Sequence, residues 1–181
     1  MESRKSPRAE WHDYSGGLYF VTIVTNHRLP YLGTIVDGKM QLSPVGKILQ
    51  FHLDSLAQHF SFIRTDCYVI MPNHFHMVIF IDKDKAPVKH RSPQLVDSLS
   101  KQQNRQSYFS NVAHLQGVLS VIVGGIKSSA TRDAHKLGLN IEWQSRFHDR
   151  IVRSYDEWMT IRHYVQNNVE KWEEDRFNPE A

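Results

Sequence analysis

Two histidines separated by a single residue are the clearest chemical feature of this chain. His74 and His76 lie in a run of mostly apolar residues, 74–82, that is typical of a β-strand. Because side chains two apart on a strand project from the same face, the two imidazoles should lie side by side. Such a pair could chelate one divalent cation or hold one phosphate group. A His-x-His pair alone is a weak signal, and two partly exposed strand histidines are an equally acceptable interpretation.

A tyrosine and an asparagine near the C-terminus favour the chemical interpretation. Ser154 and Glu157 form a capping box that predicts the start of a helix, and apolar residues at helical spacing continue it within 158–172. At about 100° per residue, Asn168 and Tyr164 lie about 40° and 80° from the centre of that apolar stripe, at the margin where helix meets sheet. Tyr164 could be an ordinary boundary residue, or a nucleophile that faces the histidine pair with Asn168 as an oxygen ligand.

The elements expected around these residues form an antiparallel sheet with helices packed on it. Asp37-Gly38 between apolar residues predicts a β-hairpin, and Ser43-Pro44 predicts the start of a helix. The order of strand, hairpin, helix, two strands, helix, strand and helix is typical of an α+β sandwich. The other strands are expected at residues 18–25, 62–71, 74–82 and 147–153, and the helices at residues 45–56, 119–134 and 154–172.

Composition limits the classes of protein that this chain could be. Its 181 residues suit one domain, and 40% hydrophobic with 23% charged residues exclude a disordered tail and a membrane protein. No apolar run approaches the roughly 18 residues of a transmembrane helix, and residues 1–8 lack the apolar core of a secretory signal. The single cysteine, Cys67, excludes a disulfide framework and a multi-cysteine zinc site. We therefore expect a cytoplasmic protein.

Charge is unevenly distributed along the chain. The 22 Lys and Arg against 19 Asp and Glu give a net charge of +3, which permits a nucleic-acid partner. Residues 83–113 hold six Lys and Arg against two Asp and Glu, a local charge of +4, and lack periodicity. We expect a basic arm at residues 1–17, one domain at 18–175 that contains a mobile basic loop at 83–113, and a tail at 176–181. The acidic end from Glu170 onward is expected to be solvated.

Four motifs, taken together, resemble a known family. They are Met71-Pro72-Asn73-His74-Phe75-His76, Gly125-Ile126-Lys127-Ser128, Trp143-Gln144 and Arg162-His163-Tyr164-Val165-Gln166-Asn167-Asn168. In this order they resemble the small single-tyrosine HUH transposases and, among these, the REP-associated tyrosine transposases. The likeness runs from about Tyr14 to Pro179, nearly the whole chain. Each motif alone is weak, but the histidine motif combined with the Tyr-x-x-x-Asn motif is specific.

The resemblance implies a ferredoxin-like or RRM-like HUH nuclease sandwich that cleaves and rejoins single-stranded DNA through a 5′-phosphotyrosine. It implies that His74 and His76 bind a divalent metal, Mg²⁺ or Mn²⁺, that Tyr164 is the nucleophile and that Asn168 completes the metal site. Hairpin (REP-like) DNA is the implied partner, with association with the bacterial nucleoid when bound. Small relatives work as homodimers that exchange helices or as monomers, so both states are expected here.

One departure from the family pattern concerns the end of the last helix. The family commonly has Asn-Asn-Pro after the tyrosine, whereas this chain has Asn167-Asn168-Val169. Because proline would normally end a helix, we expect this helix to continue toward Trp172.

Elementary chemistry is consistent with the implied roles. A phenol has a pKa near 10, so Tyr164 is a poor nucleophile at neutral pH unless its charge is offset. A cation held by His74, His76 and Asn168 could bind a phosphate oxygen and stabilise the pentacovalent transition state. Nitrogen and oxygen ligands together suit Mn²⁺ better than Mg²⁺, which leaves the identity of the ion open.

Basic residues elsewhere are candidates for contacts with DNA phosphates. Lys127 lies about 80° from the centre of its helix's apolar stripe, and could contact a phosphate or be an ordinary solvated lysine. The arm and the 83–113 loop could follow a DNA backbone, although a solvated flexible surface is the safer interpretation of the loop. The predicted DNA-binding residues are Lys127, Arg4, Lys5, Arg8, Arg150 and Arg153.

Two other functions remain open on the sequence. A non-catalytic module of the same fold would bind single-stranded or hairpin nucleic acid with an affinity that depends on salt but not on metal or on Tyr164. A metal-dependent phosphodiesterase that uses water would cleave without a covalent adduct. The combination of His74, His76, Tyr164 and Asn168 favours the tyrosine transposase.

Overall fold

The computed structural model describes residues 16–86 and 117–178. The predicted DNA contacts Arg4, Lys5 and Arg8 lie outside these residues, as does the 87–113 part of the predicted basic loop. The elements are β1 (Gly17–Val24), η1 (Asn26–Arg28), β2 (Gly33–Val36), β3 (Lys39–Leu42), α1 (Pro44–Asp54), α2 (Leu56–His59), β4 (Ile63–Ile70), β5 (His74–Ile81), α4 (Val118–Lys136), β6 (His148–Val152), α5 (Tyr155–Gln166) and η2 (Trp172–Glu174).

A four-stranded antiparallel sheet forms the centre of the molecule, with strand order β4-β5-β1-β6. β1 and β5 pair along their whole length, so that Thr22 lies opposite His76 and Val24 lies opposite His74. β2 and β3 form a separate hairpin whose turn residues, Asp37 and Gly38, have φ angles of 51° and 69°. Both values suit a type I′ turn, which confirms the hairpin predicted from Asp-Gly.

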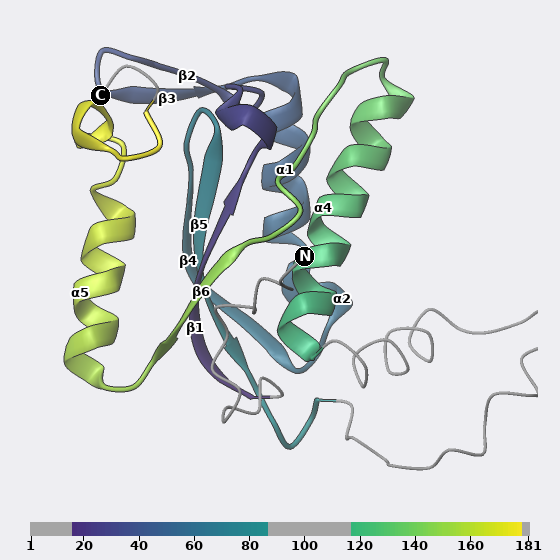
Figure 1. The fold of residues 1–181 in the computed structure, drawn as a ribbon. Helices are drawn as coiled ribbons and strands as arrows, with labels where there is room; N and C mark the ends of the chain where they lie inside the picture. The colour runs from purple at the N-terminus through teal and green to yellow at the C-terminus, as the bar shows by residue number, and fades with distance from the viewer. Residues whose placement is uncertain (1–15, 87–116, 179–181) are drawn as a thin grey trace, which may run out of the picture.

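The two faces of the sheet carry different helices. α1 and α4 cover one face and α5 covers the other, as Figure 1 shows. Four side chains of β5, at positions 75, 77, 79 and 81, belong to the larger core on the α1 and α4 side. Val78 belongs to the smaller core beneath α5, so the histidines of the same parity also face α5. This α+β arrangement confirms the predicted fold class and the predicted alternation along β5.

Hydrogen bonds fix the start of α5 and attach it to the sheet. The Ser154 hydroxyl accepts from the Glu157 N–H at 3.1 Å, which confirms the predicted helix start. One turn later the Trp158 indole N–H donates to Asp66 on β4 at 2.9 Å. Arg162 lies 3.5 Å from the same carboxylate. Asp66 therefore holds α5 against the sheet and helps to position Tyr164 near the end of the helix.

The expected continuation of the last helix toward Trp172 is wrong. α5 ends at Gln166, and Asn167 caps it with a backbone N–H and a side-chain amide that both donate to the His163 carbonyl, at 3.1 and 2.8 Å. The helix thus ends at Gln166 although no proline follows Asn168. The chain then turns back toward the sheet through η2 (Figure 1).

The chain after α5 is not the solvated end expected from its acidic composition. Asp175 and Phe177 have relative exposures of only 8% and 5%. The Phe177 ring lies 4.7 Å from the His74 ring and the Trp172 ring lies 6.1 Å from it, measured between centroids. The acidic composition was misleading because only part of the segment faces water.

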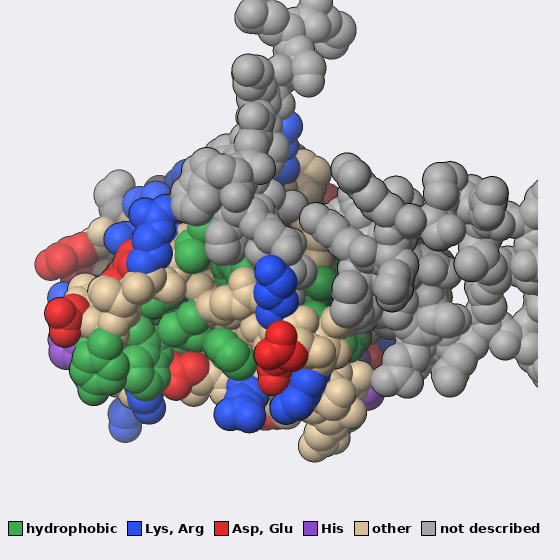
Figure 2. All heavy atoms as spheres, turned by 90° about the horizontal axis from the view of Figure 1, so that it is seen from below, with side chains coloured by type: hydrophobic (Ala, Val, Ile, Leu, Met, Phe, Trp, Pro, Cys, Tyr) green, Lys and Arg blue, Asp and Glu red, His purple; other side chains and the backbone are tan. Residues whose placement is uncertain are grey.

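The opposite end of the molecule, away from this segment and the β2–β3 hairpin, has a mixed surface. Figure 2 shows basic and acidic side chains interspersed there around apolar ones. None of the helices in the described ranges combines the length and apolar character that crossing a bilayer requires.

Candidate functional site

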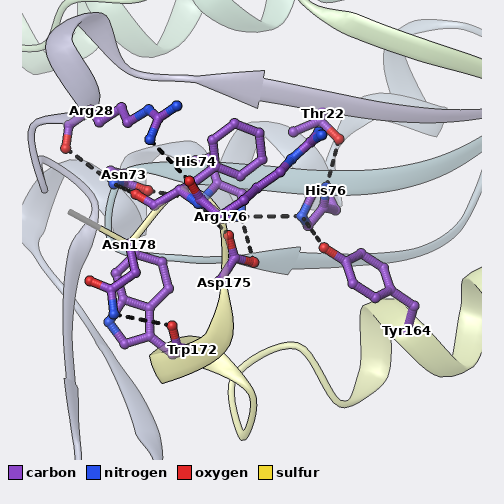
Figure 3. A network of polar contacts seen from close by, with 11 residues as sticks. Thr22, Arg28, Asn73, His74, His76, Tyr164, Trp172, Asp175, Arg176 and Asn178 are labelled. Carbon is purple, nitrogen blue, oxygen red and sulfur yellow. Dashed lines mark hydrogen bonds and ion pairs between the residues drawn. The ribbon is translucent and has the colours of Figure 1, made fainter. Parts of the chain in front are cut away.

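The two histidines of β5 are buried together at the end of the sheet nearest the C-terminus. His74 and His76 have relative exposures of 0% and 1%, and their Nε2 atoms lie 3.1 Å apart. Figure 3 shows both rings directed toward the segment that carries Asp175 and Arg176. The interpretation of the pair as partly exposed strand histidines is therefore wrong, because the segment after α5 covers them.

Asn73 determines which nitrogen of His74 is free. Its side-chain Nδ2 donates to two backbone carbonyls, those of Arg28 at 3.1 Å and Phe177 at 2.7 Å. Carbonyls only accept, so the Asn73 Oδ1 must face His74 Nδ1, 2.9 Å away. That nitrogen carries the proton, and the Nε2 lone pair of His74 is left pointing into the site.

Thr22 contacts Nδ1 of His76 as Asn73 contacts Nδ1 of His74, but Thr22 does not fix the tautomer. Its hydroxyl lies 2.7 Å from His76 Nδ1. A hydroxyl can donate or accept, so Thr22 is compatible with either tautomer of His76. When Thr22 accepts, His76 also presents an Nε2 lone pair to the site.

Burial keeps both imidazoles neutral. It is the largest cause of a lowered pKa at each ring, to about 2 for His74 and about 3 for His76. The neighbouring His76 and the guanidinium groups of Arg176 and Arg28 lower the pKa of His74 further, and Arg176 also lowers that of His76. Neutral imidazole is the form that binds metal.

Asp175 supplies a carboxylate that the sequence analysis did not identify. One oxygen lies 3.9 Å from His74 Nε2, and the other accepts from the Phe177 N–H at 2.7 Å. His74, His76 and Asp175 each offer a ligand atom within 4.8 Å of the others, and all three are buried. This group could hold a metal ion.

The geometry of the donors suits a single cation. Two nitrogens about 2.1 Å from one ion, at a right angle, would be about 3.0 Å apart, and the two Nε2 atoms are 3.1 Å apart. Two neutral imidazoles with lone pairs facing each other at that distance repel, and a cation between them removes the repulsion. The residues present therefore fit a divalent metal.

Asn168, the predicted third ligand, is buried with its amide unsatisfied. It has a relative exposure of 1%, and neither its Oδ1 nor its Nδ2 has a hydrogen-bond partner among the described residues. A buried amide without partners costs about 1–3 kcal/mol. Its side chain is close enough to Tyr164, one helical turn earlier, to lower the pKa of the phenol. Its role as ligand remains a prediction.

Tyr164 brings a hydroxyl to the edge of the histidine pair. Its OH lies 3.3 Å from Nε2 of His76, and the two rings meet edge to face with centroids 5.3 Å apart. The side chain is 42% exposed, so one side of the hydroxyl is accessible. Burial of the rest of the ring, and then the charge of Asp175, raise the pKa of the phenol. The tyrosine and histidines meet within one chain.

Of the other predicted contacts with DNA, Lys127 lies apart from this site, whereas Arg150 pairs with Phe20, whose ring stacks on that of His76. Lys127 is on α4, across the sheet from the histidines, where its Nζ donates to the Gln144 carbonyl at 2.7 Å, and it lines an open pocket of about 710 Å³ with Arg132 and Trp143. Burial lowers the pKa of Lys127 to about 8. Arg150, on the edge strand β6, lies 2.6 Å from Glu157. The roles of Lys127, Arg150 and Arg153 remain predictions.

Comparison with known proteins supports the fold. No protein-family model matches the chain. It is 28% identical over 183 residues to a Haemophilus influenzae protein described as uncharacterized, across 97% of this chain and 93% of that protein. Its structure is similar to that of a REP-associated tyrosine transposase bound to a REP hairpin, with a TM-score of 0.50 and 15% sequence identity over 91% of this chain and 72% of that one. The fold is thus a transposase-like α+β fold.

Three residues of the site were not assigned a role from the sequence. Thr22 is a polar residue inside the apolar strand 18–25, on the same parity as the face that carries the histidines, which is a usable signal. Asn73 stands next to His74 in the histidine motif. Asp175 follows Glu173-Glu174, and no pattern separates it from these exposed neighbours.

Proposed function

We propose that this protein is a metal-dependent transposase that cleaves and rejoins single-stranded DNA with Tyr164 as nucleophile. The observation that carries the proposal is the contact of the Tyr164 hydroxyl with His76, at 3.3 Å, beside a buried group that could hold a cation. A half-buried tyrosine packed only for stability would not need a buried neutral histidine at its hydroxyl, with a second histidine and a carboxylate beside that histidine.

The reaction would be an exchange of phosphate esters. The Tyr164 oxygen attacks phosphorus and loses its proton to water on its exposed side, while the bond from phosphorus to the 3′-oxygen breaks and that oxygen takes up a proton. The products are a 5′-phosphotyrosine and a free 3′-OH. Because the phosphotyrosine keeps the ester bond, attack by a 3′-OH reverses the reaction and rejoins DNA without ATP.

His74, His76 and Asp175 would hold the divalent metal, with Asn168 as the expected further ligand. Bound there, the metal would supply positive charge to a phosphate oxygen and to the phenolate. The raised pKa of Tyr164 makes this charge necessary, since the phenol remains protonated at neutral pH. Two nitrogens and a carboxylate oxygen favour Mn²⁺ over Mg²⁺.

The proposed partner is single-stranded DNA next to a hairpin. The structurally similar transposase was solved with a REP hairpin, and the motifs of this chain resemble that family. Single-stranded DNA can reach a site of this kind because its backbone bends freely and its bases need no pairing.

The test is a covalent adduct. The full chain is incubated with a single-stranded oligonucleotide that contains a foldback hairpin, with Mn²⁺ or Mg²⁺, and the products are separated under denaturing conditions. We expect an adduct with the wild type that Tyr164→Phe abolishes. The matched control is Tyr155→Phe, which removes an exposed hydroxyl at the other end of α5 and should leave the adduct unchanged.

The same gel, run beside a native gel that detects noncovalent binding, separates the other functions. Cleavage without an adduct would indicate a phosphodiesterase that uses water. Binding without cleavage, unaffected by metal or by Tyr164→Phe, would indicate a binding module. An adduct that persists in Tyr164→Phe would refute the assignment of the nucleophile.

A further inference from the structure

Two arginines far apart in the sequence meet at the entrance to the histidine pair. Arg28 ends η1, and Arg176 follows Asp175 in the C-terminal segment. The Arg28 Nη1 donates to the Arg176 carbonyl at 3.0 Å. Figure 3 shows the Arg176 side chain extending past His74 toward His76 and Thr22. Both guanidinium charges also act on His74, as its lowered pKa indicates.

A single aromatic ring supports both guanidinium groups. The central carbon of Arg176 lies 4.6 Å from the centroid of the Phe177 ring, and that of Arg28 lies 5.5 Å from it. Stacking on an aromatic ring uses the flat face of a guanidinium and leaves its N–H edges available for hydrogen bonds. Phe177 is itself buried against His74, so the two cations are held beside the histidines.

The backbone at Arg28 is held in an unusual conformation. His27 and Arg28 have φ angles of 52° and 56°, in the left-handed region that non-glycine residues seldom adopt. The Arg28 carbonyl accepts from Asn73, the residue that orients His74. Strained backbone of this kind persists where the surroundings impose it, and it is common at ligand sites. Here it ties the position of Arg28 to that of the histidine pair.

Within the part of the chain that the structure describes, neither arginine has an anionic partner. Among residues 16–86 and 117–178, no carboxylate forms an ion pair with Arg28 or Arg176, and both side chains are exposed. The nearby Asp175 is turned toward His74 and the Phe177 N–H. Arg28 uses one N–H on the Arg176 carbonyl and keeps others available. Two exposed, oriented guanidinium groups match the oxygens of a phosphodiester, which arginine can bind with two parallel hydrogen bonds.

We infer that Arg28 and Arg176 form a phosphate-binding pair that holds the backbone of single-stranded DNA against the histidine site. The inference rests on the proposed function for the identity of the ligand. In this role the arginines are positioning residues: they hold a backbone phosphate beside the Tyr164 hydroxyl. The C-terminal segment then contributes a carboxylate for the metal and a cation for the DNA.

The test measures DNA binding without catalysis. Tyr164→Phe protein is titrated with a fluorescent single-stranded oligonucleotide in EDTA at several NaCl concentrations. Each phosphate contact on a single strand contributes about 0.7 to the slope of log affinity against log salt. Substituting both Arg28→Gln and Arg176→Gln should therefore reduce the slope by about 1.4 and weaken binding at least tenfold at low salt. Replacing both by lysine should retain most of the slope and recover part of the affinity.

The matched control is Arg64→Gln. Arg64 is exposed on β4. It lies opposite Phe80, which is six residues after His74 and therefore at the other end of β5 from the histidine pair. Its removal should leave the slope unchanged, and thermal unfolding of each variant checks the fold. An unchanged slope in the double glutamine variant, or an equal loss in Arg64→Gln, would overturn the inference. The two proposals can fail separately. If the wild type forms no adduct but the double glutamine variant still shows a reduced salt slope, the proposed transposase is refuted and the phosphate-binding pair is supported.

Discussion

At the scale of single residues, the candidate site depends on which nitrogen of each histidine is free. Asn73 and Thr22 contact the Nδ1 atoms, so that both Nε2 atoms can face the same point, 3.1 Å apart. Such outer partners orient metal ligands and fix their tautomers. His74 and His76 are therefore oriented for a metal by residues that do not themselves bind it.

A prediction at this scale concerns the identity of the third ligand. Asp175→Asn removes the negative charge of the group and should weaken Mn²⁺ binding by roughly tenfold to a hundredfold, as losses around metal sites commonly do. Isothermal titration calorimetry of the full chain measures the affinity. Glu174→Gln, which alters an exposed neighbour, is the matched control and should have little effect. If Asn168→Ala weakens binding and Asp175→Asn does not, Asn168 is the third ligand and Asp175 is not.

At the scale of elements, periodicity predicted the faces, and local hydrogen bonds determined the ends. The alternation along β5 and the serines before α1 and α5 are local signals, and the structure agrees with them. The end of α5 was not predictable in the same way. The helix ends at Gln166, with Asn167 as its C-cap, although the apolar positions at 169 and 172 continue the helical pattern. Those residues pack after a turn rather than along a helix.

Two glycines in helices test how far local propensity applies. Gly124, on an exposed stretch of α4, has open space where a Cβ would lie, so Gly124→Ala should raise the free energy of unfolding by about 1 kcal/mol. Gly46, in the first turn of α1, has no such space, because a Cβ there would overlap the Leu32 carbonyl. Gly46→Ala should lower the free energy of unfolding by more than about 1 kcal/mol. Urea denaturation measures both, and a gain in both variants would contradict the packing of α1 on Leu32.

At the scale of the whole molecule, burial of the histidine pair links folding to pH. The folded chain keeps His74 and His76 neutral, with pKa values of about 2 and 3 against an ordinary value of 6.5. The unfolded chain binds protons once the pH falls below about 6.5, and the folded chain does not. Stability from these residues is therefore complete above pH 6.5 and is lost as the pH falls from there toward their folded pKa values.

The expected size of this loss can be measured by urea denaturation between pH 7.5 and 5. Each histidine lowers the free energy of unfolding by up to about 1.4 kcal/mol per pH unit below its unfolded pKa. Replacing both, as His74→Asn with His76→Asn, should flatten the profile over this range. A profile in the double variant that runs parallel to the wild type would show that other groups cause the acid dependence.

The local parts of this protein could be predicted from single stretches of its sequence. Spacing over a few residues is visible in a single sequence. It predicted the α+β class, the hairpin at Asp37-Gly38, the shared face of the two histidines and the start of the last helix. The depth at which the histidines are buried, and the segment that covers them, depend on contacts between distant parts of the chain. Asn73 bonds to Phe177 across 104 positions of sequence, and Asp175 reaches His74 because the chain turns back after α5. No periodicity encodes such contacts, because they depend on the direction in which a chain leaves a helix and on the surface that it meets.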